Sequence, residues 1–168
     1  MSTALMSDIP FVEARHSGRK QRPKVVSLRL TETTSKHGAA MGIARYWNAS
    51  NSPIESCHYV VDEELTLQCV PVDKVAYSSK FDAKGTISIN VCAFPTFDVN
   101  EWLDTERAEA LDNAAKLTAR LSKAHNIPIR YVDLLDHRRI FSRGGIMVNV
   151  RGSWPTHTFL TKVEAYRS

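Results

Sequence analysis

Histidines are the side chains of this sequence whose type points most directly to chemistry. The chain has six, and His58, His137 and His157 lie in segments that a fold could bring together. A catalytic zinc ion needs three nitrogen, sulfur or carboxylate ligands and one open position. The spacing of these histidines matches no local zinc signature such as His-Glu-x-x-His. Taken singly, each is more typical of a hydrogen-bonded structural or surface residue than of a metal ligand.

Other catalytic motifs are missing from the sequence. It contains no nucleophile elbow, no phosphate-binding glycine loop and no dinucleotide fingerprint. The pair Gly144-Gly145 is expected to form a flexible turn. Trp154 and His157 stand close together in a stretch that could line a groove, because both side chains can stack on or hydrogen-bond to a ligand. The same stretch could equally be a packed C-terminal loop.

The positive charge of the chain is concentrated near the N-terminus. The net charge is +4, and five basic residues fall within ten positions that contain no acid. Such a run is often a solvated tail. It could also be an arm that lies on an acidic partner such as nucleic acid, an anionic wall polymer or another subunit. The residues concerned are Arg15, Arg19, Lys20, Arg22 and Lys24.

The three cysteines do not suggest a disulfide framework or a cysteine zinc site. Cys57, Cys69 and Cys92 are odd in number, widely spaced and contain no Cys-x-x-Cys pair. Each lies in an apolar run typical of a strand. We therefore expect buried thiols in a reduced compartment.

Hydrophobic periodicity predicts strands separated by helices. Ile87, Ile89 and Val91 alternate with polar residues, which is typical of a strand with one face on the core. Asp98 and Glu101 have the form of a helix capping box, and an apolar stripe follows at helical spacing. The predicted strands are 25–30, 57–61, 65–70, 86–93, 129–132 and 146–150; the predicted helices are 39–47, a long helix that stops at Asn126 and Pro128, and one or two turns in the last ten residues.

A chain of 168 residues with this order of elements is expected to form one domain. We predict an α/β (α+β) fold in which helices flank a central mixed sheet. Residues 1–23 are predicted to be an extended basic arm, and residues 24–168 the folded domain. No apolar run is long enough to span a membrane, so no membrane partner is expected. The N-terminus lacks the apolar region of a secretory signal.

Several segments, taken together, resemble one known family. They are the strand 25–30 with Thr31-Glu32, the stretch Ser-Cys-His-Tyr-Val-Val-Asp at 56–62, Val75-Ala76-Tyr77 and the strand 86–91. With the long helix and the segments around 136–138 and 154–158, the chain resembles the zinc-dependent N-acetylmuramoyl-L-alanine amidases of type 2. This family includes phage endolysins and peptidoglycan recognition proteins. The resemblance covers about residues 24–160 and implies their fold.

The resemblance also implies positions for a zinc site, and the sequence departs from them. The first ligand, a histidine at the end of the first strand, is matched by Arg29; the second by His137; the third, near the C-terminus, by Phe159. Asn90 stands where the family usually has a glutamate, and Ser78 where a histidine often follows the Val-Ala-Tyr segment. Arginine has no lone pair to offer and phenylalanine no donor atom. We therefore expect no cofactor, with zinc only if these positions are misassigned.

Three functional hypotheses follow. The first is a non-catalytic amidase-fold protein, a phage virion structural or attachment component located in the virion or the host cytoplasm, whose basic arm binds other subunits. The second is a peptidoglycan-binding module, and the third an active zinc amidase with ligands elsewhere, with His58, His137 and His157 among the candidates. A nucleic-acid partner ranks last. The groove expected for a wall fragment is lined by Arg29, Tyr77, His137, Trp154 and His157.

Overall fold

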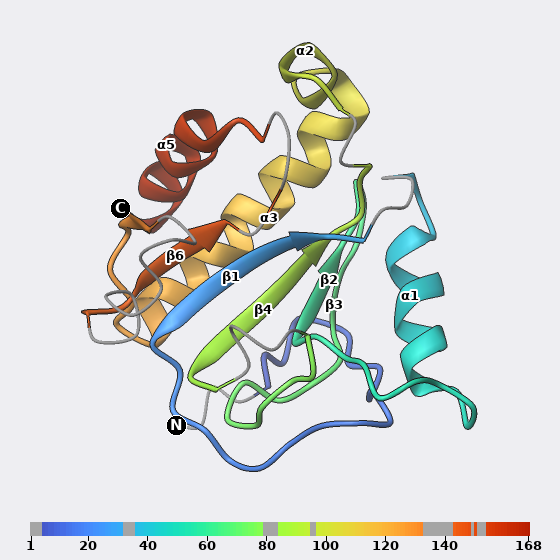
Figure 1. Ribbon diagram of the computed structural model, residues 1–168. Helices are drawn as coiled ribbons and strands as arrows, with labels where there is room; N and C mark the ends of the chain where they lie inside the picture. The colour runs from blue at the N-terminus through green and yellow to red at the C-terminus, as the bar shows by residue number, and fades with distance from the viewer. Residues whose placement is uncertain are drawn as a thin grey trace.

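The computed structural model describes residues 5–31, 36–78, 84–94, 97–132, 143–148, 150 and 154–168. Within them, six strands form one sheet in the order β3-β2-β4-β1-β6-β5 (Figure 1). All neighbouring strands are parallel except β2 and β3, which form an antiparallel pair. The predicted mixed sheet is confirmed, with shorter strands than expected. The strands are β1 (Val25–Leu30), β2 (Tyr59–Val61), β3 (Thr66–Gln68), β4 (Thr86–Val91), β5 (Tyr131–Val132) and β6 (Gly145–Val148).

Helices cover both faces of the sheet. The long helix α3 (Thr105–Ala124) and the C-terminal helix α5 (Thr156–Arg167) pack together on one face, and α1 (Ala39–Asn48) packs near β2 and β3 on the other (Figure 1). A short helix, α2 (Val99–Trp102), precedes α3. None of the helices in the described ranges is long and apolar enough to cross a bilayer.

The predicted long helix is interrupted near its start. The capping box is present: the backbone N–H of Asp98 donates to Glu101 Oε2, and that of Glu101 donates to Asp98 Oδ1, both at 2.8 Å. This box begins α2, however, and the chain turns at Leu103 and Asp104 before α3 begins. The box therefore caps a four-residue helix rather than the long one.

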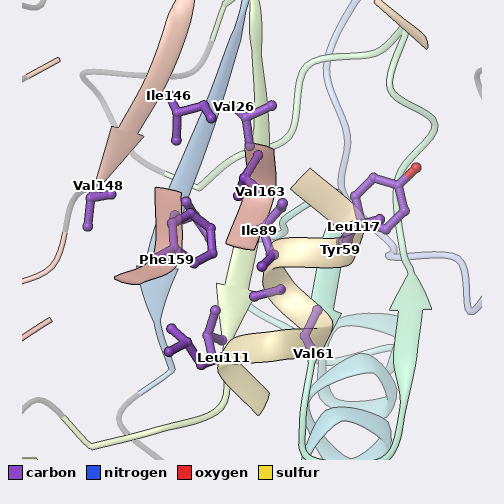
Figure 2. Packing of buried hydrophobic residues seen from close by; sticks show 14 of the residues in the cluster. Val26, Tyr59, Val61, Ile89, Leu111, Leu117, Ile146, Val148, Phe159 and Val163 are labelled. Carbon is purple, nitrogen blue, oxygen red and sulfur yellow. The ribbon is translucent and has the colours of Figure 1, made fainter. Parts of the chain in front are cut away.

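The main core lies between the sheet and α3. Alternation along β1 directs Val26 and Leu28 to this face, where they are fully buried. Ile89 of β4 and Leu111 of α3 belong to the same cluster, and α5 adds Phe159 (Figure 2). Burying an aliphatic or aromatic side chain of this size stabilises the fold by about 1.5–3 kcal/mol. This packing fixes which side chains of each strand must point to the opposite face.

The opposite face of the central strands is polar. Ser27 of β1 and Thr86 and Ser88 of β4 are buried there. Because side chains alternate along a strand, Arg29 and Asn90 share this face. Buried polar side chains on the face of a sheet are unusual for a protein core. The candidate site lies on this face.

The N-terminal arm is hydrogen-bonded to the β3 edge of the sheet. The backbone N–H of Val12 donates to Gln68 O at 2.9 Å, and that of Ala14 to Cys69 O at 2.8 Å. Phe11 forms a parallel bridge with Gln68, so the arm runs beside β3. Residues of the chain itself therefore hold the arm in place, as Figure 1 shows for the blue segment. The domain boundary at residue 23 stays a prediction.

Candidate functional site

The candidate site lies at the carboxyl ends of β1 and β4. In the parallel register of these strands Arg29 is paired with Asn90, so the two side chains are direct neighbours on the polar face. Arg29 is half-buried, and its Nη1 donates a hydrogen bond to the backbone carbonyl of Ser78. The segment after β3 thus anchors one end of the guanidinium, and the other N–H groups form no hydrogen bond with the residues that the structure describes.

Asn90 carries an acceptor that has no partner among the described residues. Its Oδ1 is buried and accepts no hydrogen bond from the described residues. Leaving a buried acceptor unpaired costs about 1–3 kcal/mol. An unpaired acceptor beside a half-buried cation indicates a site where a bound ligand would supply the missing hydrogen-bond donor.

His58 is held in a structural network next to this site. Its Nδ1 accepts a hydrogen bond from the backbone N–H of Ser88 at 3.0 Å, and its Nε2 lies 2.7 Å from Lys74 O. The ring therefore carries its proton on Nε2 and donates it to that carbonyl. With both nitrogens engaged and the residue buried, His58 is not placed to bind a metal ion. Its role is to join β4 to the segment that follows β3.

The aromatic residues near the C-terminus form core rather than groove. Trp154 is 8% exposed, and its ring lies 5.0 Å from that of Trp102 and 5.2 Å from that of Phe159, edge to face. Phe159 is fully buried within α5. Both residues belong to the cluster on the α3 face, opposite Arg29. The prediction that Trp154 lines a groove with Arg29 is therefore wrong, because α5 directs this segment inward.

The other predicted groove residues are only partly brought together. Tyr77 is 40% exposed and lies next to Ser78, whose carbonyl binds Arg29. Together with Gly18, Arg19, Val75 and Lys84, Tyr77 lines a pocket of about 420 Å³. His157 is exposed in the first turn of α5, the helix on the opposite face. His137 lies outside the described residues.

Strand order shows that β6, rather than β5, adjoins β1. The resemblance implied a second ligand after the strand that follows the long helix, which is β5. That strand lies at the edge of the sheet, and β6 is the strand that pairs with β1. Val148, the last residue of β6, is level with Leu28, so the carboxyl end of β6 adjoins that of β1. The next residue, Asn149, lies outside the described part. Chain order alone could not reveal this neighbour.

The donor set does not fit the zinc site that the resemblance implied. Arg29 has no lone pair for a metal, and Phe159 has no donor atom and is turned into the core. Among the described residues, no three His, Cys, Asp or Glu side chains are grouped so that they could hold a metal ion.

The basic residues of the arm remain at the surface. Lys20 forms an exposed ion pair with Asp73 at 3.4 Å. Arg22 and Lys24 line a second pocket, of about 250 Å³, with Arg143 and His125. Burial lowers the pKa of His125 from its ordinary value. This pocket lies by the amino end of β1, away from Arg29.

The profile of a known family matches most of the chain. The family is described as N-acetylmuramoyl-L-alanine amidase, and the match spans residues 19–146. The chain belongs to this family. The N-acetylmuramoyl-L-alanine amidase CwlH of Bacillus subtilis (strain 168) is 26% identical over 162 residues, a match that covers 86% of this chain and 61% of CwlH. The chain thus spans less than two thirds of the length of that relative.

Solved structures show the same fold. A mutant of PlyL superposes with a TM-score of 0.67 at 16% identity, covering 94% of this chain and 99% of that one. The catalytic domain of XlyA gives a TM-score of 0.65 at 19% identity, covering 93% and 99%. At these identities the likeness concerns the fold.

These matches correct the first functional hypothesis. A non-catalytic virion structural or attachment component is not supported, since the matches are to an amidase family, an amidase and a catalytic domain. The arm also gives that hypothesis no support. Its backbone is bonded to its own sheet, so no neighbouring subunit is needed to explain its order. The prediction that Arg15, Arg19, Lys20, Arg22 and Lys24 bind other subunits is likewise unsupported.

Proposed function

We propose that this amidase-family chain acts on peptidoglycan and hydrolyses the amide bond between the N-acetylmuramoyl group and L-alanine. The single observation that carries the proposal is the family match over residues 19–146. The relative CwlH, which bears the name of this activity, agrees with it.

The reaction has a simple chemical balance. The oxygen of water adds to the amide carbonyl carbon, and the carbon–nitrogen bond breaks. A carboxylate remains on the muramoyl side, and the nitrogen takes a proton to become the free amino group of L-alanine. Each bond cleaved therefore releases one new amino group, which provides the measurement.

A second candidate is peptidoglycan binding without cleavage. It is favoured by two positions at which the resemblance implied metal ligands: Arg29, a permanent cation in place of a histidine, and Phe159, which is fully buried in the core on the opposite face. In this case the protein would retain the wall fragment, and no amino groups would appear.

One experiment separates the two candidates. Purified protein is incubated with insoluble peptidoglycan; new amino groups are measured by dinitrophenylation, and protein that sediments with the wall is measured on gels. Amino groups that rise with time and carry N-terminal alanine support hydrolysis. Sedimentation without release supports the second candidate. Neither signal, from protein that is folded by circular dichroism, overturns both.

A further inference from the structure

The carboxyl ends of β1 and β4 present a donor and an acceptor side by side. Arg29 is a half-buried cation, and no described carboxylate forms an ion pair with it. Asn90, its register partner, has a buried Oδ1 that accepts no hydrogen bond from the described residues. A cation taken partly out of water favours an anion, and a buried acceptor favours an N–H group.

The spacing of these two groups fits one amino-acid residue. Neighbouring strands lie about 4.8 Å apart, so side chains paired in register can reach the same small group. The last residue of a peptide carries a carboxylate and an N–H only a few bonds apart. Arginine binds carboxylates with two parallel N–H groups, and one edge of Arg29 is already fixed by the carbonyl of Ser78.

We propose that Arg29 and Asn90 form a metal-free site for the carboxylate end of a stem peptide of peptidoglycan. The guanidinium of Arg29 binds the terminal carboxylate, and Asn90 Oδ1 accepts the N–H of the same residue. Arg29 stands at the position that the resemblance assigns to a metal-binding histidine. In this proposal its permanent charge recognises the carboxylate of the peptide instead. This inference rests on the proposed action on peptidoglycan and names the part of the substrate that the site reads.

Tyr77 comes directly before Ser78, the residue whose carbonyl binds Arg29. It is exposed at a pocket of about 420 Å³, where Arg19 and Lys84 add positive charge. An exposed aromatic ring that lines a pocket together with cations suits a peptide that carries a carboxylate and apolar side chains. The pocket and Arg29 therefore both favour negatively charged ligands.

The test uses two probes that differ only at the carboxylate. N-acetylmuramoyl-L-alanyl dipeptide is titrated into the full chain as the free acid and as the C-terminal amide, by isothermal calorimetry after dialysis against a chelator. The free acid is expected to bind at least about tenfold more tightly, the difference made by one charge-assisted pair. Added zinc is expected to leave both affinities unchanged.

Substitutions assign the preference to the site. Arg29→Gln is expected to remove the acid preference, and Arg29→Lys to keep only part of it, because the ammonium lacks the planar fork. Asn90→Asp places a carboxylate beside the guanidinium and is expected to weaken acid binding while leaving the amide form nearly unchanged. Arg45→Gln, which removes one exposed cation from α1, is the matched control and is expected to behave like the parent.

Three results would overturn the proposal: equal affinity of the parent for both probes, an acid preference that survives Arg29→Gln, or binding that requires zinc. Asn90→Asp and the two probes on the parent keep the test decisive if Arg29→Gln does not fold. Sedimentation with whole peptidoglycan shows whether a failure concerns this site or the proposed function. A parent that sediments with the wall but does not discriminate the probes contradicts this site alone, whereas a parent without action or retention contradicts the proposed function.

Discussion

At the residue scale, Phe159 shows how the fold reassigns a position. It stands where the resemblance placed a metal ligand, yet it is fully buried and packs edge to face with Trp154. Helical spacing places Val163 four residues later on the same inward face. The position therefore contributes to stability through the contact of α5 with the core.

Replacement of Phe159 by alanine tests this role. We expect Phe159→Ala to lower the free energy of unfolding by about 3–5 kcal/mol, because it removes a buried ring and leaves a cavity. Urea denaturation followed by tryptophan fluorescence measures the change. His157→Ala, an exposed substitution in the same helix, should stay within about 0.5 kcal/mol. A Phe159→Ala loss no larger than that of the control would contradict the assignment.

His125 gives the chain a pH dependence. Burial lowers its pKa below the ordinary value of about 6.5, so the folded state binds a proton less readily than the unfolded chain. The unfolding free energy is therefore expected to be higher above that pH and to fall as the pH is lowered through the lowered pKa. Thermal melts between mildly acidic and neutral pH measure the slope.

A matched pair of variants isolates this contribution. His125→Gln should make the acid-side fall in stability shallower by a fraction of a proton per molecule. His157→Gln, which changes an exposed histidine of α5, is the matched control. Identical slopes in the parent and in His125→Gln would show that another group causes the fall.

At the element scale, Gln21 joins the arm to the sheet. Its Nε2 donates to Val72 O at 3.0 Å and to Thr86 O at 2.9 Å, while its Oε1 accepts from the backbone N–H of Gly85 at 2.8 Å. Gly85 adopts a φ of 79°, which favours glycine at this turn before β4. One side chain thus pairs with backbone groups at the start of β4 and with one in the segment that follows β3.

Removal of this side chain should therefore be costly for a partly buried polar residue. We expect Gln21→Ala to lower the free energy of unfolding by about 1–3 kcal/mol, because backbone groups lose their partners. Chemical denaturation measures it, with Arg22→Ala, an exposed neighbour, as the control. If both substitutions lower the free energy of unfolding by the same small amount, water replaces the hydrogen bonds of Gln21 without loss of stability.

Most helices and strands could be predicted from the sequence. The contacts that could not be predicted all join residues far apart in the chain. Alternation in 86–91 and helical spacing in 105–124 depend on neighbours in the chain, so the strand and the long helix were predicted. The pairing of the arm with Gln68 joins residues more than fifty positions apart. No local pattern encodes such a contact.

The candidate site was predictable only in part for the same reason. The resemblance to the amidase family singles out Arg29, because it stands where that family has a histidine at the end of the first strand. Its pairing with Asn90, the burial of Trp154 and the neighbourhood of β6 depend on sheet register and strand order. These are properties of the assembled sheet rather than of any segment.

At the scale of the whole molecule, the arm and the domain are expected to be inseparable. Ile9 and Ala14 are buried in the two core clusters, and the arm backbone is bonded along β3. Deletion of residues 1–23 should lower the midpoint of thermal unfolding by several degrees or abolish folding, since more than one core contact is lost. Circular dichroism and calorimetry measure this.

Charge and backbone pairing can be separated in this test. The combined variant Arg15→Gln, Arg19→Gln and Arg22→Gln keeps the arm and removes three exposed cations. It is expected to melt close to the parent. A deletion that melts like the parent would show that residues 24–168 fold independently.

The position of the arm also bears on how the molecule meets copies of itself. Exposed strand edges are places where unrelated chains add and aggregate. One outer edge of the described sheet, at β3, is occupied by residues 10–14, and the other belongs to β5, which has only two residues. The chain thus presents little free edge for intermolecular pairing. It should remain dispersed at concentrations where a version lacking the arm forms β-rich aggregates.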